Sequence, residues 1–437
     1  MRISVIGCGY LGAVHAACMA SLGHEVIGVD VNAAKVAKLN AGEPPFFEPG
    51  FKEILSEQVK SGRLAFTCEY ADAADAQISF IAVGTPQSSS RNAADMSYVE
   101  SALDGLLTNL TGDEPKLIVG KSTVPVGTAE AISRRLAGKS LLVWNPEFLR
   151  EGFAVDDTLH PDRIVYGLPA DPGDAKTAQG LLDECYSRLL AEGTPRLLTD
   201  YATAELVKVA ANSFLATKIS FINAMAELCD ASGADVTKLA EAIGYDYRIG
   251  KKFLRAGLGF GGGCLPKDIR AFMARAGELG VEQALTFLRE VDTVNLRSRQ
   301  RAVEIAKEMA GGTFVGRRVA VLGAAFKPNS DDLRDSPALD IAQQISARGA
   351  DMVITDPQAA DGLRVKRPNL CVVDTAEEAM HNADVTVLGT EWREYVELDP
   401  AEAKIWVRQP NILDGRNVLD AAAWQAAGWN YRGIGRR

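Results

Sequence analysis

One cysteine of the chain stands in a setting that favours reactivity. In GLGFGGGCLPKD, Cys264 follows five glycines within residues 257–263 and precedes Lys267 and Asp268. A loop with so few side chains lets a ligand approach the backbone, and a nearby ammonium favours the thiolate, the form that attacks carbonyl carbons. The alternative is a small buried thiol, which we expect for the other six cysteines because they are widely spaced and form no C-x-x-C pair. Cys264 is therefore the candidate nucleophile.

Two further polar pairs have the residue types that such chemistry needs. Lys208 and Asn212 are four residues apart, so they share one face of an apolar helix and could bind a reacting oxygen and its proton. Glu147 and Glu151 lie in NPEFLREG, at the end of a predicted strand where ligands of open α/β sheets bind, and a carboxylate there could activate water. The alternative to a functional role is that Lys208 only extends its ammonium into solvent and that Glu147 and Glu151 are surface carboxylates.

A glycine pattern near the N-terminus predicts a dinucleotide site. Gly7, Gly9 and Gly12 form G-x-G-x-x-G after an apolar strand and open a helix, whose N–H groups can receive the phosphates. Asp30 ends the next strand, where its carboxylate can accept hydrogen bonds from ribose hydroxyls and repel the phosphate of NADP. NAD is therefore the expected cofactor. The alternatives are a glycine turn without a ligand and, for Lys35 near this edge, a solvated ammonium.

The elements that must carry these groups predict an α/β fold of two Rossmann-like parallel-sheet lobes, joined by a long central helix and a helical domain. Strand and helix patterns alternate over residues 1–195, the first lobe. Residues 201–231 contain neither Gly nor Pro and are apolar at helical spacing, which predicts one helix of about 45 Å. We expect this helix to join domains and to pack against a second subunit, within a helical dimerisation domain of residues 196–310.

Residues 311–437 repeat the strand, loop, helix and strand order of the N-terminus, in RRVAVLGAAFKP, ALDIAQQISARG and ADMVITDP. This second lobe lacks the glycine pattern and has Phe326 and Lys327 where the loop should hold a ligand. Its ligand is therefore expected to differ from a dinucleotide.

Composition limits the partners. The 437 residues include 47 Lys and Arg and 57 Asp and Glu, and the net charge of −10 argues against nucleic acid or an anionic membrane as a partner. The apolar stretch 3–29 is interrupted by His15, His24 and Glu25, so we expect neither a signal peptide nor a membrane span, and a cytoplasmic protein. No metal site is expected.

At this point the motifs resemble those of a known family over essentially the whole chain. They are GCGYLG, VGTP, STVPVGT, NPEFLREG, PDRIV, KVAAN, DYRIGKKFLRAGLGFGGGCLPKD, GAAFKPNSDDLRDSP and ILDGRNVLD. By them the chain resembles the UDP-glucose/GDP-mannose dehydrogenases. The resemblance implies that NAD oxidises the C6 alcohol of a nucleotide sugar twice, through a thiohemiacetal and a thioester on Cys264, to a carboxylate.

The resemblance also implies roles for individual residues. Glu147 would assist water attack or proton transfer, Lys208 and Asn212 would hold the C6 oxygen, and Asp268 would orient Lys208 and the water. The implied cofactor-binding residues are Gly7, Gly9, Tyr10, Leu11, Gly12, Asp30, Lys35, Thr85, Thr123, Glu151, Lys267 and Arg334. The implied substrate-binding residues are Phe148, Leu149, Arg150, Glu151, Lys208, Asn212, Phe253, Leu254, Arg255, Gly259, Phe260, Gly261, Phe326, Lys327 and Arg416, with Arg248 reaching in from a partner subunit.

Within the family, UDP-glucose is the expected substrate and UDP-glucuronate the product, with GDP-mannose as the runner-up. Glu147, Lys208 and Lys267 argue against the branch that acts on UDP-N-acetylmannosamine, and Gly263 replaces a usual Ser. Outside the family, the alternatives are a one-step dehydrogenase of the 6-phosphogluconate or hydroxy-acid type, which needs no cysteine nucleophile, and an inactive NAD-binding sensor. A homo-oligomer, at least a dimer, is expected.

Overall fold

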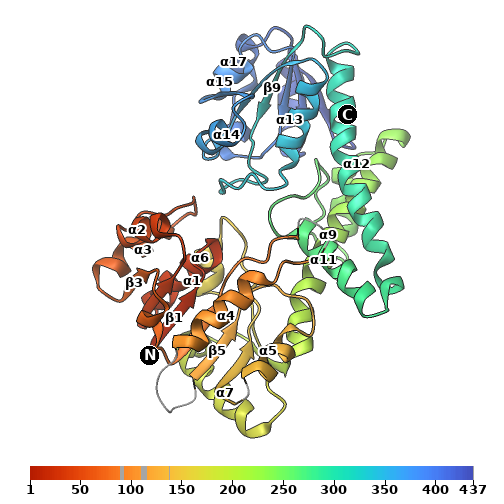
Figure 1. Ribbon diagram of the computed structural model, residues 1–437. Coiled ribbons are helices and arrows are strands. Elements are labelled where there is room, and N and C mark those ends of the chain that lie inside the picture. Colours follow the sequence, from red (N-terminus) through yellow and green to blue (C-terminus); the bar gives the residue numbers. More distant parts are fainter. Residues whose placement is uncertain (89–92, 110–115, 137, 437) are drawn as a thin grey trace. The chain divides into compact units, whose positions relative to one another are not determined.

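The computed structural model describes residues 1–88, 93–109, 116–136 and 138–436. These residues form two compact units, each built on its own sheet (Figure 1). The first unit contains Met1–Ala211 and Arg270–Gly280, and the second contains Asn212–Ile269 and Val281–Arg437. The α/β class with two Rossmann-like lobes and a central helical region is confirmed.

The described part of the first unit holds an eight-stranded sheet in the order β3-β2-β1-β4-β5-β6-β7-β8. The order reverses between β1 and β4, which is where doubly wound sheets open a crevice for a ligand. The strands are β1 Arg2–Ile6, β2 Glu25–Val29, β3 Leu64–Thr67, β4 Ile78–Ile81, β5 Lys116–Gly120, β6 Ser140–Trp144, β7 Ile164–Leu168 and β8 Arg196–Asp200.

Helices cover both faces of this sheet, because the buried apolar side chains fall into two separate layers. One layer includes α1 and α3, and the other includes α4 and α5 (Figure 1). The helices that begin in this unit are α1 Tyr10–Ser21, α2 Ala33–Asn40, α3 Phe51–Lys60, α4 Ser97–Asn109, α5 Thr128–Leu136, α6 Ala154–Leu159, α7 Pro172–Cys185, α8 Ser187–Ala191 and α9 Tyr201–Ser232, with a 3-10 turn at Tyr70–Ala73.

The prediction that the first sheet is parallel throughout is wrong at one place. β7 pairs with β6 in the antiparallel sense, through Trp144 and Gly167. A parallel β7 would require the chain to return to the opposite edge of the sheet, a crossover that usually takes a helix of a dozen or more residues. The only helix between them is α6, which has six residues. The chain therefore turns back at the carboxyl edge, and residues 145–163 stay there.

The second unit contains a six-stranded sheet in the order β11-β10-β9-β12-β13-β14, and every pairing among its described strands is parallel. The order reverses between β9 and β12. The strands are β9 Arg318–Leu322, β10 Asp351–Thr355, β11 Cys371–Val373, β12 Val385–Leu388, β13 Asn411–Asp414 and β14 Asn430–Gly433. The helices of this lobe are α13 Pro337–Ala347, α14 Ala360–Lys366, α15 Ala376–Met380, α16 Arg393–Val396, α17 Pro400–Trp406 and α18 Ala421–Ala426.

A helical region lies between the two sheets in the sequence. It consists of α9, α10 Val236–Gly244, α11 Leu265–Glu278, a 3-10 turn at Glu282–Leu285, and α12 Thr286–Met309. The prediction of one long helix over 201–231 is confirmed by α9, which has 32 residues. The boundary between the two compact units passes through α9, after Ala211.

Four cysteines are buried as expected: Cys8, Cys18, Cys185 and Cys229. Cys68 is half-buried, and Cys371 is exposed, so the expectation of a buried thiol is wrong for Cys371. Cys371 is exposed because it begins β11, which lies at the edge of the second sheet.

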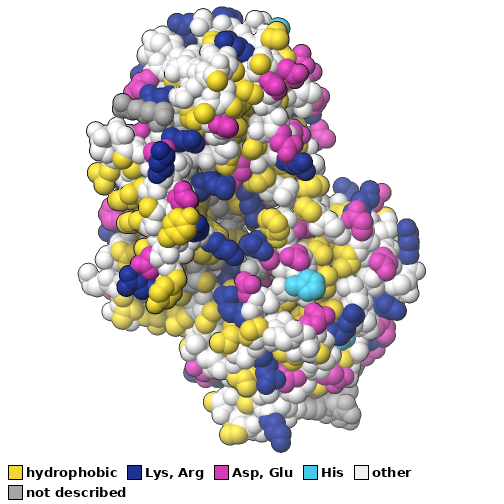
Figure 2. All heavy atoms as spheres, turned by 180° about the vertical axis from the view of Figure 1, so that it is seen from behind, with side chains coloured by type: hydrophobic (Ala, Val, Ile, Leu, Met, Phe, Trp, Pro, Cys, Tyr) yellow, Lys and Arg dark blue, Asp and Glu magenta, His cyan; other side chains and the backbone are white. Residues whose placement is uncertain are grey.

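Both signs of charge appear on the face of the molecule in Figure 2. This mixture fits a chain in which 57 acidic residues are nearly balanced by 47 basic ones. Among the described residues, no helix combines the length and the apolarity that crossing a membrane requires.

We predict that Gly120→Ala destabilises the protein, because an added Cβ would lie 2.1 Å from Cζ3 of the buried Trp144 ring. Overpacking of this kind lowers the free energy of unfolding by about 1–3 kcal/mol. Gly180→Ala, in the exposed part of α7 with no described atom near the added Cβ, should raise it by about 0.5–1 kcal/mol. Urea unfolding of both variants measures the difference, and equal stabilities would contradict the packing.

Candidate functional site

The glycine turn after β1 is shaped for a close approach to phosphate. Gly7 has φ of +92°, and an added Cβ would lie 2.6 Å from Cγ1 of Val83. At Gly12 the added atom would lie 1.9 Å from the Gly7 carbonyl oxygen, so this glycine permits the helix to pack on the strand. No described atom lies within 4 Å of a Cβ built at Gly9. The backbone is therefore accessible at the position where the pyrophosphate is expected.

The N-terminus of α1 follows this turn directly. Gly9 occupies the N-cap position, no described side chain caps the helix, and the first turn contains no acidic residue. Tyr10 and Leu11, both predicted cofactor residues, form the first positions of α1. Uncapped N–H groups and the positive end of the helix dipole favour an anion such as a diphosphate.

Asp30 lies at the carboxyl end of β2 in a buried position. Its Oδ1 accepts the Asn32 N–H at 2.9 Å, and its Oδ2 lies 2.7 Å from the Lys35 Nζ. Lys35 is thus an ion-pair partner rather than a solvated side chain. The pair holds the carboxylate in one orientation, in which its remaining lone pairs can accept hydrogen bonds from ribose hydroxyls.

Two predicted cofactor residues from different loops touch each other. The Thr85 hydroxyl, after β4, donates to the Thr123 carbonyl at 2.7 Å, after β5. β4 pairs with β1 on the side where the strand order reverses, and β5 is the next strand beyond β4. The geometry therefore brings Thr85 and Thr123 to the crevice at the carboxyl edge.

Glu147 and Lys208, which are 61 positions apart in the sequence, form a buried ion pair with Nζ 3.0 Å from Oε1. The other carboxylate oxygen of Glu147 accepts the Leu149 N–H at 2.7 Å. The Phe148 ring contacts two cations, with its centroid 5.7 Å from the Lys208 Nζ and 3.9 Å from the Arg163 Cζ. The carboxylate and the ammonium are thus held together with 13% and 7% of their side chains exposed, within reach of each other for proton transfer.

The following residues of the same loop differ in exposure. Glu151 is buried, whereas Arg150 is exposed and binds Asp157 with its backbone N–H at 2.7 Å and its Nε at 2.9 Å. In this arrangement the Arg150 guanidinium forms an ion pair with Asp157 on the following helix, α6.

In the second unit, Cys264 is exposed and directly precedes α11. Its carbonyl accepts the Asp268 N–H at 2.9 Å. The buried Asp268 carboxylate accepts a hydrogen bond of 2.7 Å from the Asn212 amide and lies 2.7 Å from the Lys267 Nζ. Three predicted residues therefore meet in the first turn after Cys264, where the positive end of the helix also favours a thiolate.

The glycines before Cys264 make room for protein atoms rather than for a ligand alone. An added Cβ would lie 2.4 Å from the Asn295 Oδ1 at Gly259, 2.2 Å from the Asp335 carbonyl oxygen at Gly261, and 2.3 Å from the Arg334 Cζ at Gly263. Tight packing on α12 and on the second lobe therefore requires glycine at these three positions. Contact of the loop backbone with a ligand stays a prediction.

Asn295 on α12 holds this loop with both ends of its amide. Its Oδ1 accepts the Phe260 N–H at 2.7 Å, and its Nδ2 donates to the Phe260 carbonyl at 3.0 Å. Arg299, one turn later, donates to the same carbonyl at 3.1 Å. The backbone of Phe260 is therefore fixed from α12.

A cavity of about 780 Å³ lies within the second unit. Its lining includes five predicted substrate residues, namely Phe253, Leu254, Arg255, Gly259 and Arg416. Its other side is formed by residues of α10 that the sequence did not predict, among them Thr237, Ala240 and Glu241. Two arginines in one cavity provide the positive charge that a diphosphate requires.

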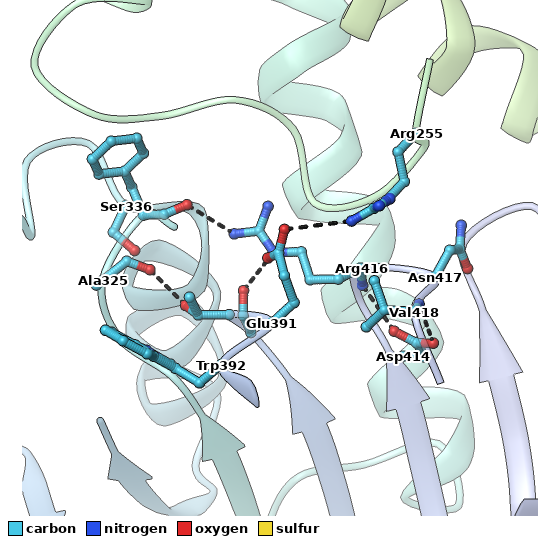
Figure 3. Close-up of polar contacts among 12 residues, drawn as sticks. Arg255, Ala325, Ser336, Glu391, Trp392, Asp414, Arg416, Asn417 and Val418 are labelled. Carbon is cyan, nitrogen blue, oxygen red and sulfur yellow. Dashed lines mark hydrogen bonds and ion pairs between the residues drawn. The ribbon is translucent and has the colours of Figure 1, made fainter. Parts of the chain in front are cut away.

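Arg416 is held by three groups at the carboxyl edge of the second sheet (Figure 3). Its Nε donates to the Gly389 carbonyl at 2.7 Å, and its Nη2 donates to the Phe326 carbonyl at 3.2 Å. The Glu391 carboxylate lies 3.4 Å from Arg416 and 3.7 Å from Arg255, between the two cations. Burial lowers the pKa of Arg416, while Glu391 opposes this shift.

Two predicted substrate residues lie elsewhere on the second unit. The Lys327 Nζ is 5.2 Å from the centroid of the neighbouring Phe326 ring. Arg248 is exposed, and its guanidinium binds Asp246 of the same chain, with Nε 3.0 Å from Oδ1 and Nη2 2.6 Å from Oδ2.

Among the described residues, no group of three or more His, Cys, Asp and Glu side chains is arranged to hold a metal ion.

Several residues that contact the predicted site residues or their loops are not predicted by the sequence patterns: Lys121, Asn145, Glu205, Asn295, Arg299 and Glu391. Glu205 could have been found, because it lies one helical turn before Lys208 on the same face of α9. Asn145 could have been noticed as the first residue of NPEFLREG. Nothing in the sequence pattern singles out the others, because their partners lie far away in the chain.

One lobe has a Rossmann fold with a glycine turn suited to a dinucleotide, and the second, doubly wound lobe has a cavity lined by two arginines. Together these features are typical of a two-lobed dehydrogenase. Models of the UDP-glucose/GDP-mannose dehydrogenase family match the chain in three parts: the NAD binding domain at residues 1–189, the central domain at 202–297 and the UDP binding domain at 320–421. The chain belongs to this family. It is an NAD-dependent nucleotide-sugar dehydrogenase, as the resemblance implied.

Individual relatives agree with this placement. The UDP-glucose 6-dehydrogenase of Rhizobium meliloti is 40% identical over 445 residues, which cover 100% of both chains. A solved UDP-glucose dehydrogenase from Pyrobaculum islandicum is 38% identical with a TM-score of 0.89, covering 100% of this chain and 98% of that one. A GDP-mannose dehydrogenase from Pseudomonas aeruginosa is 30% identical with a TM-score of 0.54, covering 99% and 100%.

The buried Glu205 ties α9 to the loop that follows Thr123. Its carboxylate accepts the Gly127 N–H at 2.7 Å and the Ala129 N–H at 2.6 Å, where α5 begins. Burial raises the pKa of Glu205 to about 7, although these N–H donors and Arg275 act in the opposite direction. The folded protein therefore binds a proton at Glu205 more tightly than the unfolded chain does.

From this shift we predict that the contribution of Glu205 to stability is greatest below about pH 4.5 and is lost as the pH rises through about 7. Between pH 5 and pH 8, the free energy of unfolding of the wild type relative to Glu205→Gln should fall by roughly 2 kcal/mol. Urea unfolding at both pH values measures this, with the exposed Glu53→Gln as the control. A difference that does not change with pH would contradict the buried carboxyl.

Proposed function

We propose that the protein is a UDP-glucose 6-dehydrogenase, which oxidises UDP-glucose to UDP-glucuronate with two NAD while the sugar is bound covalently to Cys264. The observation that carries this proposal is the exposed Cys264 at the start of α11, directly before Lys267 and the buried Asp268–Asn212 pair. An exposed thiol with a fixed carboxylate, amide and ammonium beside it has the groups that covalent catalysis on an aldehyde needs.

The proposed reaction assigns one task to each group. Bound NAD supplies the hydride acceptor for each of the two oxidations. Lys208 and Asn212 bind the C6 oxygen as it becomes a carbonyl, and the Cys264 thiolate adds to the aldehyde carbon to form a thiohemiacetal. Loss of the second hydride leaves a thioester, which water hydrolyses with help from Glu147, so that the uronate leaves and the thiolate is regenerated.

The cavity in the second unit supports a nucleotide diphosphate sugar as the substrate. Arg255 and Arg416 supply the cations, and the residues of 253–259 form one wall. We propose UDP-glucose rather than GDP-mannose as the substrate. The relatives named as UDP-glucose dehydrogenases match the chain at higher identity and, among structures, at a higher TM-score. A one-step dehydrogenase would have no use for the Cys264 cluster.

We predict that the purified protein forms two NADH per UDP-glucose and that Cys264→Ala lowers turnover at least about a thousandfold, because the covalent route is lost. Absorbance at the NADH band and product analysis measure both quantities. Cys371→Ala, which removes the other exposed thiol, should retain full activity. One NADH per sugar, or an active Cys264→Ala, would contradict the double oxidation, and NADH formation with GDP-mannose alone would contradict the substrate.

We also propose that the protein is a homodimer that pairs through α9, within a central domain of residues 196–310 between lobes of residues 1–195 and 311–437. Phe214, Phe221 and Leu228 repeat every seven residues along α9 and are 67%, 50% and 60% exposed. This spacing places large apolar side chains on one side of the helix, as helices that pair with a second copy require. Arg248 would then act from a partner subunit, and the enzyme would work in the cytoplasm.

Phe221→Glu is predicted to convert the dimer into monomers, because a charge in the middle of a paired apolar stripe is costly to bury. Sedimentation velocity of the full chain measures the mass. Ile405→Glu is the control, since Ile405 is 82% exposed on α17 outside the stripe. A wild type that sediments as a monomer, or a Phe221→Glu variant that remains dimeric, would contradict the proposed interface.

A further inference from the structure

A lysine that the proposed reaction does not use lies buried behind the Glu147 loop. Lys121 follows β5 directly, and its Nζ lies 3.0 Å from the Asn145 Oδ1 and 3.3 Å from the Tyr186 hydroxyl. The ammonium is also 5.7 Å from the centroid of the Phe80 ring and 5.8 Å from that of Tyr186. No carboxylate of the described residues forms an ion pair with it within 4.0 Å. Lys121 therefore carries a buried charge that polar contacts and aromatic rings compensate only in part.

Such a charge costs stability. Removing an ammonium from water without an ion-pair partner is unfavourable, and apolar side chains of similar volume often stabilise a protein at such positions. Burial accordingly lowers the pKa of Lys121 to about 8, while the negative charge of Glu147 acts in the opposite direction. An unbranched methionine would fill the space between Phe80 and Tyr186 without this cost. Packing alone therefore gives no reason for a lysine here.

The contacts of Lys121 reach the loop that contains Glu147. Asn145, the first residue of that loop, accepts from Lys121 and, at 2.8 Å, from the Tyr186 hydroxyl. Its Nδ2 donates to the Val165 carbonyl at 2.9 Å, and its backbone N–H donates to the Gly120 carbonyl at 2.8 Å. Both the side chain and the backbone of Asn145 are therefore fixed, two residues before Glu147.

The charge of Lys121 also reaches Glu147. Glu147 attracts the Lys121 ammonium strongly enough to oppose the effect of burial on its pKa. The attraction between two charges is mutual, so the Lys121 ammonium also favours the charged carboxylate of Glu147.

We propose that Lys121 is a positioning residue for Glu147: its buried ammonium holds Asn145 in place and stabilises the Glu147 carboxylate during hydrolysis of the thioester. The inference rests on the proposed function, because it assigns Lys121 to the step that Glu147 assists. Lys121 does not contact the reacting atoms in this assignment.

The test is Lys121→Met in the full-length protein, compared with the wild type at pH 7. The variant should have an unchanged or raised melting temperature, because a buried charge is removed, but a turnover reduced at least about tenfold. Rapid mixing with UDP-glucose and excess NAD should give a burst of two NADH per site, followed by a slow steady state. Mass spectrometry of the stopped reaction should then find the sugar on Cys264.

Two further variants make the result unambiguous. Lys116→Met, at the other end of β5, is the matched control and should retain wild-type turnover without a burst. Lys121→Gln keeps a hydrogen-bond donor for Asn145 without the charge, so it should also show the burst, and it provides the measurement if the methionine variant fails to fold.

Turnover within twofold of the wild type in Lys121→Met or Lys121→Gln would overturn the proposal. The proposal would also be overturned if both variants lost turnover together with a lower melting temperature. A variant whose first hydride transfer is already slow and which shows no burst would overturn it as well. Failure of the proposed function is distinguishable, because the wild type itself would then form no NADH from UDP-glucose.

Discussion

Parallel strands have their carboxyl ends at one edge of a sheet, and this constraint arranges the polar groups of both lobes. In the first sheet, Gly7, Asp30, Thr85, Lys121 and Glu147 follow five different strands and reach the same edge. They are brought together although they span about 140 residues of sequence. In the second sheet the same rule places Phe326, Glu391 and Arg416 around one cavity or beside it. Each lobe thus assembles a ligand edge from short loops on a rigid scaffold.

Charge is distributed differently at the two edges. In the first unit, the Glu147 carboxylate has one cation in direct contact, Lys208, and a second, Lys121, within electrostatic reach. In the second unit, the Glu391 carboxylate lies between Arg255 and Arg416. The first arrangement concentrates positive charge around a group suited to proton transfer. The second arrangement places two guanidinium groups at the lining of one cavity with a carboxylate between them.

The glycines illustrate how one residue type serves different purposes. Gly9 has open space beside it, which suits the close approach of a ligand to the backbone. Gly259, Gly261 and Gly263 have protein atoms where a Cβ would be, so they permit the loop before Cys264 to pack against α12 and the second lobe. Cys264, which is exposed, consequently lies on a loop that is held from several directions.

The sequence by itself determined the α/β class, the long helix α9 and the glycine turn, and it singled out Cys264 as the candidate nucleophile, because local periodicity and short motifs specify these features over a few residues. It did not predict the antiparallel β7, because the direction of that strand depends on the length of α6 and on the space left at the sheet edge. Nor did it predict Lys121, Glu205 or Asn295. Their importance depends on burial and on partners 24 to 78 positions away, and such contacts exist only when the chain has folded.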